Sequence, residues 1–160
     1  MINEVYIDNN ISSEVSYSYI EVYNKTNNAI DLSNYKVIVN GEEYVIVNGI
    51  INPKSTYLIA FANMGSVNNQ STYFPIPDSA YNVNINSENL TIVLKDSNNA
   101  LIDKLGINNV NDCETESFKT NDFSLSITRK HDIDTNNNLR DFVSIKRSPI
   151  NNNNEGIVTN

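Results

Sequence analysis

Apolar residues recur along this chain in short runs with a two-residue period, the alternation that places successive side chains on opposite faces of a β-strand. In residues 19–23, for example, Ile20 and Val22 alternate with two tyrosines and a glutamate. About nine runs rich in Val, Ile and Tyr follow such a pattern. They cover residues 2–7, 17–23, 35–39, 44–47, 57–62, 90–94, 100–105, 123–128 and 142–145. No stretch keeps the period of an amphipathic helix, so the pattern predicts an all-β fold, either a sandwich or a barrel.

Turn residues mark the connections between these runs. Asn40-Gly41 stands between two of them and predicts a tight hairpin, because both positions of such a turn need positive φ. Residues 65–89 are polar, and we expect them to cross between sheets with one extra short strand at 72–75. The expected organisation is a single sandwich over residues 1–150, followed by an Asn-rich flexible tail over residues 151–160. The residues predicted to form its core are Ile20, Val22, Leu58, Leu90, Ile92, Leu94 and Leu125.

The composition narrows the class of protein. With 160 residues, 39% of them hydrophobic, the chain can form one domain around a single core. No apolar run approaches the roughly 18 residues of a membrane span, so no membrane insertion is expected. The net charge of −8 repels phosphate backbones and argues against binding to nucleic acid. The amino terminus, residues 1–4, has no basic region followed by an apolar stretch, so we expect no signal peptide in this chain.

Side chains that carry catalytic chemistry are scarce in the sequence. His131 is the only histidine, and the only cysteine, Cys113, lies among acidic residues that disfavour its thiolate. They supply neither a nucleophile with its base nor the three or four ligands of a zinc site. Glu4 and Glu21 fall within strands, where accepting structural hydrogen bonds is the expected role of a carboxylate. The sequence therefore predicts that the chain is not an enzyme and has no catalytic and no cofactor-binding residue.

One acidic loop, residues 132–141, has part of the pattern of a calcium-binding loop. Oxygen-bearing side chains stand at alternate positions, namely Asp132, Asp134, Asn136 and Asn138. The glycine of the sharp turn is missing, and Val143 stands where a calcium loop has its bidentate glutamate. Asp and Asn in this density are also typical of turns that bond their own backbone. We interpret the loop as a structural turn, with calcium as a weak alternative and no other cofactor.

Tyrosine is the main aromatic residue, with nine copies and no tryptophan. Tyr19, Glu21 and Tyr23 share one face of their predicted strand, opposite the apolar Ile20 and Val22. If this face meets solvent, it offers rigid amphipathic contacts to a protein or a sugar ring. The alternative is that tyrosine replaces Phe and Trp at ordinary sheet positions. This face is the candidate interaction surface of the chain.

Several short motifs follow one another along the chain. They are the opening strand at 2–5, Tyr-Ile-Glu-Val-Tyr-Asn at 19–24, the turn Ala-Ile-Asp-Leu-Ser-Asn-Tyr at 29–35, the Asn-Pro-Lys turn and strand at 51–58, the hairpin with Leu-Lys-Asp and Leu-Ile-Asp at 94–103, Ser-Leu-Ser-Ile-Thr-Arg at 124–129, and the closing segments at 134–142 and 148–152. Their order and spacing resemble the lamin tail domain family, as it occurs in bacterial proteins. The resemblance extends over residues 2–152. The chain departs from the family pattern at Asn34-Tyr35, where the family has Gly-Trp, and at Ile150, where it has Gly.

The resemblance implies an immunoglobulin-like β-sandwich but no single activity, since one fold serves many functions. Bacterial domains of this kind resemble accessory modules of larger extracellular or surface proteins. Our leading hypothesis is a non-catalytic structural or protein-interaction module, with a protein or surface ligand as its partner. The alternative is a carbohydrate- or cell-surface-binding domain that targets an attached enzyme. Either implies a secreted or cell-surface location, with the cytoplasm as the alternative compartment.

Overall fold

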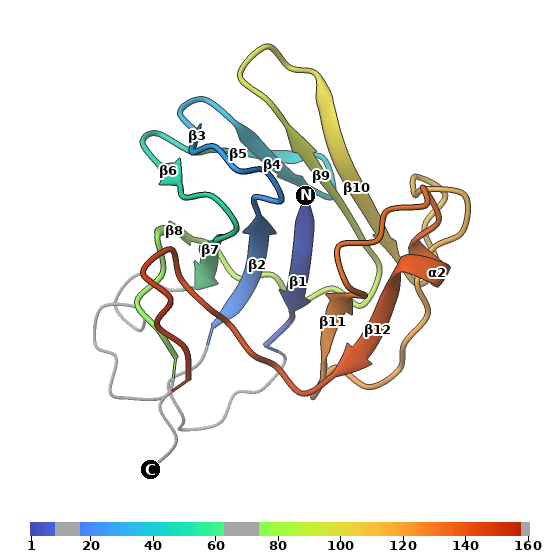
Figure 1. Cartoon of the computed structure of the whole chain (residues 1–160). Coiled ribbons are helices and arrows are strands. Elements are labelled where there is room, and N and C mark those ends of the chain that lie inside the picture. Colours follow the sequence, from blue (N-terminus) through green and yellow to red (C-terminus); the bar gives the residue numbers. More distant parts are fainter. Residues whose placement is uncertain (9–16, 63–73, 158–160) are drawn as a thin grey trace.

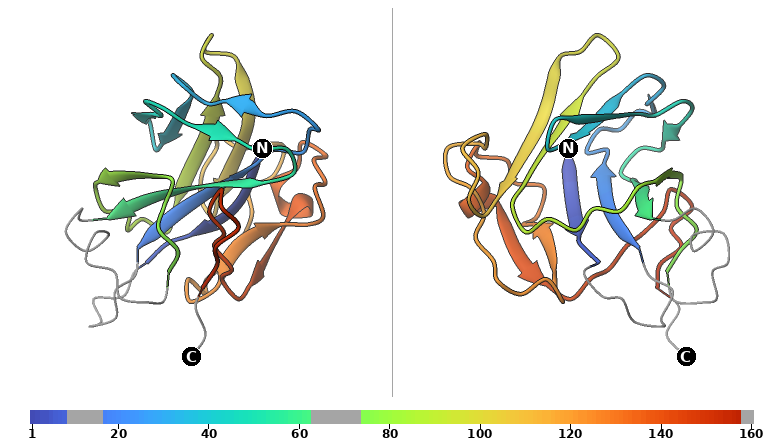
Figure 2. Two further views of the ribbon diagram at one scale, coloured as in Figure 1. Left: turned by 60° about the vertical axis from the view of Figure 1, so that its left-hand side comes forward. Right: turned by 180° about the vertical axis from the view of Figure 1, so that it is seen from behind.

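Every predicted run overlaps a strand in the computed structural model, which describes residues 1–8, 17–62 and 74–157. The described strands gather into two main sheets that face each other, as Figure 1 and the two further views of Figure 2 show. The all-β class and the immunoglobulin-like sandwich architecture are thereby confirmed. In this part of the chain, no helix is long and apolar enough to cross a membrane.

The larger sheet contains both early and late parts of the chain. Its neighbours are antiparallel, except that β8 runs parallel to β7 at one edge. The pairing of β1 with β11 joins the first described strand to one more than a hundred residues later. In order across the sheet, the strands are β12 (Phe142–Ile145), β11 (Ser126–Arg129), β1 (Ile2–Tyr6), β2 (Ser18–Tyr23), β7 (Thr56–Ala62) and β8 (Ser79–Asn82).

The second sheet has four antiparallel strands: β10 (Leu101–Ile107), β9 (Leu90–Lys95), β4 (Lys36–Val39) and β5 (Glu42–Val45). The predicted hairpin joins β4 to β5, and both turn residues have positive φ, at 48° for Asn40 and 89° for Gly41. Asn40 also joins the turn to β9, the neighbouring strand in the sheet, because its Oδ1 accepts a 2.8 Å hydrogen bond from the backbone N–H of Thr91.

Smaller elements complete the fold. Two short strands, β3 (Ile30–Asp31) and β6 (Ile50–Ile51), pair with each other. A four-residue helix, α2 (Asn138–Asp141), leads directly into β12 and is capped by the side chain of Asn137. The expected extra strand at 72–75 lies partly outside the described residues, and its described part, Phe74 and Pro75, is not a strand. The strand of this region is instead β8, a few residues later.

Six of the seven predicted core residues are buried. Five of them belong to the main core between the two sheets, and Leu58 belongs to a second cluster described below. Ile20, Leu90 and Ile92 are each 1% exposed. The prediction is wrong for Leu125, which is only half-buried because it precedes β11 rather than belonging to it. Ile127, two residues later, occupies the core position on that strand at 2% exposure.

A second apolar cluster lies on the other face of the larger sheet. It comprises Tyr6, Tyr17, Tyr19, Leu58, Ala60, Ala62 and Phe74. Its existence means that β2 and β7 are buried on both faces, and all seven residues of β7 are buried. Water is kept from this face in part by residues 146–152, here called the closing segment, which leave β12 and run back across the sheet toward β8 (Figure 1).

Candidate functional site

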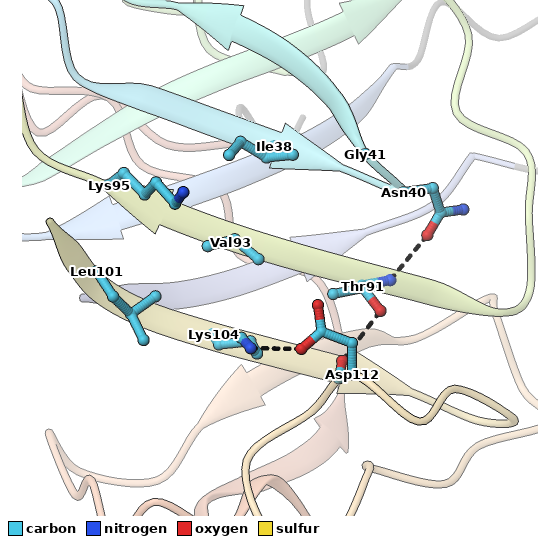
Figure 3. A pocket seen from close by; sticks show the side chains of 9 residues that line it. All are labelled: Ile38, Asn40, Gly41, Thr91, Val93, Lys95, Leu101, Lys104 and Asp112. Atoms are coloured by element: carbon cyan, nitrogen blue, oxygen red, sulfur yellow. Dashed lines mark hydrogen bonds and ion pairs between the residues drawn. The ribbon is translucent and has the colours of Figure 1, made fainter. Parts of the chain in front are cut away.

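The outer face of the four-stranded sheet carries a shallow groove of about 460 Å³, within the range of ligand-binding depressions. The groove follows from strand alternation, because β4, β9 and β10 turn one set of side chains inward to the core and the other outward. Figure 3 shows this outward set from close by. The lining consists of Ile38, Asn40, Gly41, Thr91, Val93, Lys95, Leu101, Lys104 and Asp112.

The register places these outward side chains in rows that cross the strands. In one row Ile38 pairs with Val93, and Val93 pairs with Lys104. In the next row, Lys36 pairs with Lys95, which in turn pairs with Leu101. The first row therefore has an apolar centre, and the second has two lysines side by side.

The charges of the groove are only partly balanced. Lys36 lies 3.5 Å from a carboxylate oxygen of Glu43 on β5, and Lys104 forms an ion pair with Asp112. Lys95 has no ion-pair partner among the described residues. Lys95, Lys104 and Asp112 line the groove, and the Lys36–Glu43 pair lies beside it. The unit charges of these five residues sum to about +1, on a chain whose net charge is −8.

The exposure of the apolar side chains rises from the centre of the groove to its edge. Val93 at the centre is 8% exposed, whereas Leu101 at the edge strand is 56% exposed. A partner that covers Leu101 would remove that apolar area from water, which is favourable. The groove can therefore bind a ligand with apolar and acidic groups, but it holds no nucleophile or base arranged for catalysis among its described residues.

The candidate face predicted at Tyr19, Glu21 and Tyr23 is not exposed, and this interpretation needs correction. Tyr19 is 0% and Glu21 2% exposed, and Tyr23 is half-buried. The reason is the closing segment: the backbone N–H of Ile150 donates a 2.8 Å hydrogen bond to Glu21 Oε2. Sequence alternation correctly placed the three side chains on one face but gave no sign that a distant segment covers it.

Glu4 and Glu21 are cross-strand partners beneath the closing segment, and both carboxylates are buried. Glu4 accepts hydrogen bonds from the backbone N–H and the hydroxyl of Ser148, at 2.8 and 2.9 Å, and from the hydroxyl of Tyr19. Burial raises the pKa of Glu21 to about 7, although hydrogen bonds from Asn3 and Ile150 partly oppose this rise. Burial, aided by the nearby Glu4 charge, also raises the pKa of Tyr19. These contacts agree with the structural role expected for the two glutamates.

The predicted tail begins as part of the sandwich. Asn151 is 2% exposed, and its side-chain amide donates to the carbonyl of Ile76 at 3.0 Å. The backbone N–H of Asn152 donates to Asp78 Oδ2 at 2.9 Å. The expected boundary after residue 150 is therefore too early, since packing continues to Asn152, and residues 158–160 lie outside the described part of the chain.

The candidate calcium residues do not form one ligand set. Asp132 and Asn136 are exposed and have positive φ, at 58° and 54°, as in turns. Asp134 Oδ1 accepts a 3.2 Å hydrogen bond from the backbone N–H of Asn136. Asn138 is 0% exposed and serves the interior instead, accepting from the N–H of Gly106 at 2.9 Å.

A different acidic group gathers beside this loop. Carboxylate oxygens of Glu114, Asp134 and Asp141 lie within 4.8 Å of one another. A protein cation already lies next to two of them, because Nη1 of the buried Arg129 is 3.6 Å from Asp141 Oδ2 and 3.9 Å from Asp134 Oδ1. Burial, together with repulsion from Asp103 and other acidic neighbours, raises the pKa of Glu114 to about 7. The arrangement is that of a structural ion-pair network.

The remaining catalytic candidates are far from any arrangement that performs chemistry. His131 is exposed in the turn that follows β11, and Cys113 is half-buried in the loop after β10. None of the hydrogen bonds between described residues joins either side chain to a nucleophile or a base.

Comparison with known protein families identifies the chain. A family model, described as the Lamin Tail Domain, matches residues 1–109. The chain belongs to the lamin tail domain family. No curated protein matches it.

The match to the lamin tail domain confirms the family named from the sequence motifs, and the structure extends the domain beyond the matched residues. β11 and β12 lie after residue 109 but complete the larger sheet by pairing through β1. The family is immunoglobulin-like, generally non-catalytic, and serves protein interaction or structure. The groove is formed by β4, β9 and β10, which lie within the matched region.

Sequence reasoning did not find the groove. Its signal was present as Lys36 two residues before Ile38 and Val93 two residues before Lys95. Only the register of β4 with β9 shows that the two lysines are neighbours and that the two apolar side chains are neighbours.

Proposed function

We propose that this lamin tail domain is a non-catalytic protein-interaction module whose binding surface is the groove on the outer face of the four-stranded sheet. The observation that carries the proposal is the difference between the two outer faces. The larger sheet has its outer face covered in part by its own closing segment, whereas the smaller sheet leaves Leu101 exposed and Ile38 half-buried beside the buried Val93. Exposed apolar groups ringed by polar ones are typical of interaction sites.

The module serves, in this proposal, as an accessory domain of a larger secreted or cell-surface protein. The absence of a catalytic arrangement among the described residues and the family's general role support an accessory function. The carbohydrate-binding alternative has less support. Of the tyrosines that motivated it, Tyr19 is buried and Tyr23 half-buried, and the described groove residues include no aromatic side chain. Aromatic platforms are the usual contact for sugar rings and their apolar faces.

Site-specific photo-crosslinking in the native host tests this surface. A photoreactive phenylalanine analogue is introduced in place of Leu101, which is 56% exposed, or in place of Ile76, which is 72% exposed and precedes β8 on the other sheet. We expect a defined protein adduct from position 101 and none of the same mass from position 76. The captured protein, once purified, should bind the wild-type domain, and Val93→Arg should weaken that binding about tenfold or more.

Equal crosslinking from both positions, or binding unaffected by Val93→Arg, would contradict the proposal. A thermal melt of each variant serves as the folding control. The proposed secreted or cell-surface location is checked by fractionating host cells and detecting the full protein in each fraction. Recovery of the protein in the cytosol alone would contradict this location.

A further inference from the structure

We infer that the groove binds an extended acidic segment of a partner protein, with one carboxylate placed between Lys36 and Lys95 and an aliphatic side chain over Val93. This inference rests on the proposed function and names the class of partner. It is carried by the register of β4 and β9, by the charges of the groove and by the exposure of Leu101 at its edge.

The first argument is the cost of the lysine pair. Lys36 and Lys95 are direct cross-strand partners, and like charges directly opposite each other destabilise a sheet. Glu43 offsets only one of the two charges, and Lys95 has no ion-pair partner among the described residues. A pair of like charges that the fold itself does not neutralise is destabilising, and such unfavourable pairs are expected mainly at functional sites. A carboxylate from a partner would supply the missing compensation.

The second argument is the contrast between the groove and the whole chain. The chain has 19 acidic and 11 basic residues. Two of its lysines, Lys95 and Lys104, line this one groove, and Lys36 is the cross-strand partner of Lys95. An acidic segment is therefore repelled by the net charge of the chain but attracted at the groove, which favours one docking position over others. The carboxylates of Glu43 and Asp112 at the rim disfavour a continuous polyanion such as nucleic acid, whose charges would pass over them as well.

The third argument is the spacing of the rows. The lysine row and the apolar row lie two residues apart along β4 and along β9, which is roughly 6.6 Å. An extended peptide has the same two-residue repeat on the face that it turns toward the sheet. A segment lying along β9 therefore presents an acidic residue to Lys36 and Lys95 and, two residues later, an aliphatic residue to Ile38 and Val93. Leu101 covers the side of such a segment at the β10 edge.

The test uses the whole purified chain and a fluorescein-labelled peptide of the sequence Gly-Glu-Ser-Val-Ser-Glu-Ser-Val-Gly with blocked ends. We expect fluorescence anisotropy to show binding that weakens as salt rises, since exposed ion pairs are screened. The matched peptide with glutamine in place of glutamate should bind at least about tenfold more weakly. Lys95→Glu should weaken binding of the glutamate peptide by a similar factor, whereas Lys146→Glu, an equal charge change at an exposed position in the closing segment, should not.

A charge-swap variant makes the test specific. In the double variant Lys36→Glu with Lys95→Glu, a peptide with lysine in place of glutamate should bind better than the original peptide, provided that the melting curve shows an intact fold. No binding of the glutamate peptide up to about millimolar concentration, or equal weakening by Lys146→Glu, would overturn the inference. If the peptide fails but crosslinking at position 101 identifies a partner, only this inference falls and the proposed function remains.

Discussion

At the residue scale, a few buried polar side chains fix the loops of this domain to its sheets. Asn138 is the clearest example, because all of its side-chain polar groups are used inside the protein. Its Oδ1 accepts from the N–H groups of Gly106 and Glu114 at 2.9 and 3.1 Å. Its Nδ2 donates to the carbonyl of Lys104 and to Glu114 Oε2 at 2.9 and 3.0 Å. It therefore joins α2 to β10 and to the loop that follows β10.

Replacing Asn138 by alanine should lower the free energy of unfolding by roughly 2–4 kcal/mol, because the buried N–H of Gly106 loses its acceptor. Asn109→Ala is the matched control, since Asn109 is exposed and its side chain makes no hydrogen bond within the described residues. The measurement is chemical denaturation of both variants with the wild type. A loss well below 1 kcal/mol for Asn138→Ala would show that water can replace these bonds.

The raised pKa of Glu21 leads to a pH dependence of stability. Because its pKa is about 7 in the folded protein and near 4.5 otherwise, the folded state holds the proton more tightly between these values. The contribution of Glu21 to the free energy of unfolding is therefore fully present below pH 4.5 and is lost as the pH rises to about 7. We expect Glu21→Gln to reduce this loss by roughly 2–3 kcal/mol, measured by urea unfolding at several pH values.

Glu88→Gln, at an exposed position, provides the control for Glu21→Gln and should leave the pH profile as in the wild type. An unchanged profile for Glu21→Gln would mean that Glu21 is not the source of the dependence. Glu114, whose pKa is also raised to about 7, would then be the next residue to test.

At the scale of elements, alternation predicted the strands well but could not predict what covers them. The positions of β2 and β9 follow from their own residues, because period-two patterns are local. The burial of Tyr19 and Glu21 depends on residues such as Ile150, which lies 129 positions from Glu21. In the same way, the groove depends on the pairing of Lys36 with Lys95, a contact between strands that are distant in sequence. Sequence patterns therefore predict the strands, whereas predicting which strand faces are exposed requires the order in which the strands pair.

The loop at 132–141 is likewise an element whose residues suggested one role and whose contacts favour another. Asp141 accepts hydrogen bonds from the N–H and hydroxyl of Thr135 at 2.8 and 2.7 Å, and Arg129 lies beside it. A calcium ion would have to compete with this guanidinium. We predict that millimolar calcium, compared with excess chelator, leaves the melting temperature unchanged.

A calcium-dependent rise of several degrees that disappears in Asp134→Ala would contradict the prediction for this loop. Such a rise is the expected signature of binding to the folded state alone. Asp122→Ala, which removes an exposed carboxylate before β11, is the control for a general effect of charge.

At the scale of the whole molecule, the domain combines a closed face and an open one around a single inter-sheet core. The fold class and the family could be predicted from the sequence, because strand patterns and short motifs extend along nearly the whole chain. The carboxyl-terminal boundary of the domain could not be predicted from the sequence. Asn151 and Asn152 belong to an Asn-rich run, which gives no apolar signal of burial.

The whole-molecule prediction for chemistry is that purified protein turns over no substrate in a broad screen of esterase, glycosidase, phosphatase and nuclease substrates. The physical reason is that Glu4 and Glu21, the closest pair of candidates, are used to hold the closing segment. Turnover that disappears in Glu4→Gln would contradict this prediction. Glu88→Gln would show whether such a loss is specific.

The route of the closing segment also sets the order in which the chain can fold during synthesis. Its contacts with Glu4 and Glu21 join residues 144 and 129 positions apart. At a translation rate of roughly 5–20 residues per second, Ile150 is made about 6–26 s after Glu21. Throughout that interval the tyrosine-rich face of the growing chain lacks its cover. Synthesis of the closing segment therefore ends the period in which a nascent chain exposes that face to chaperones or to other unfinished chains.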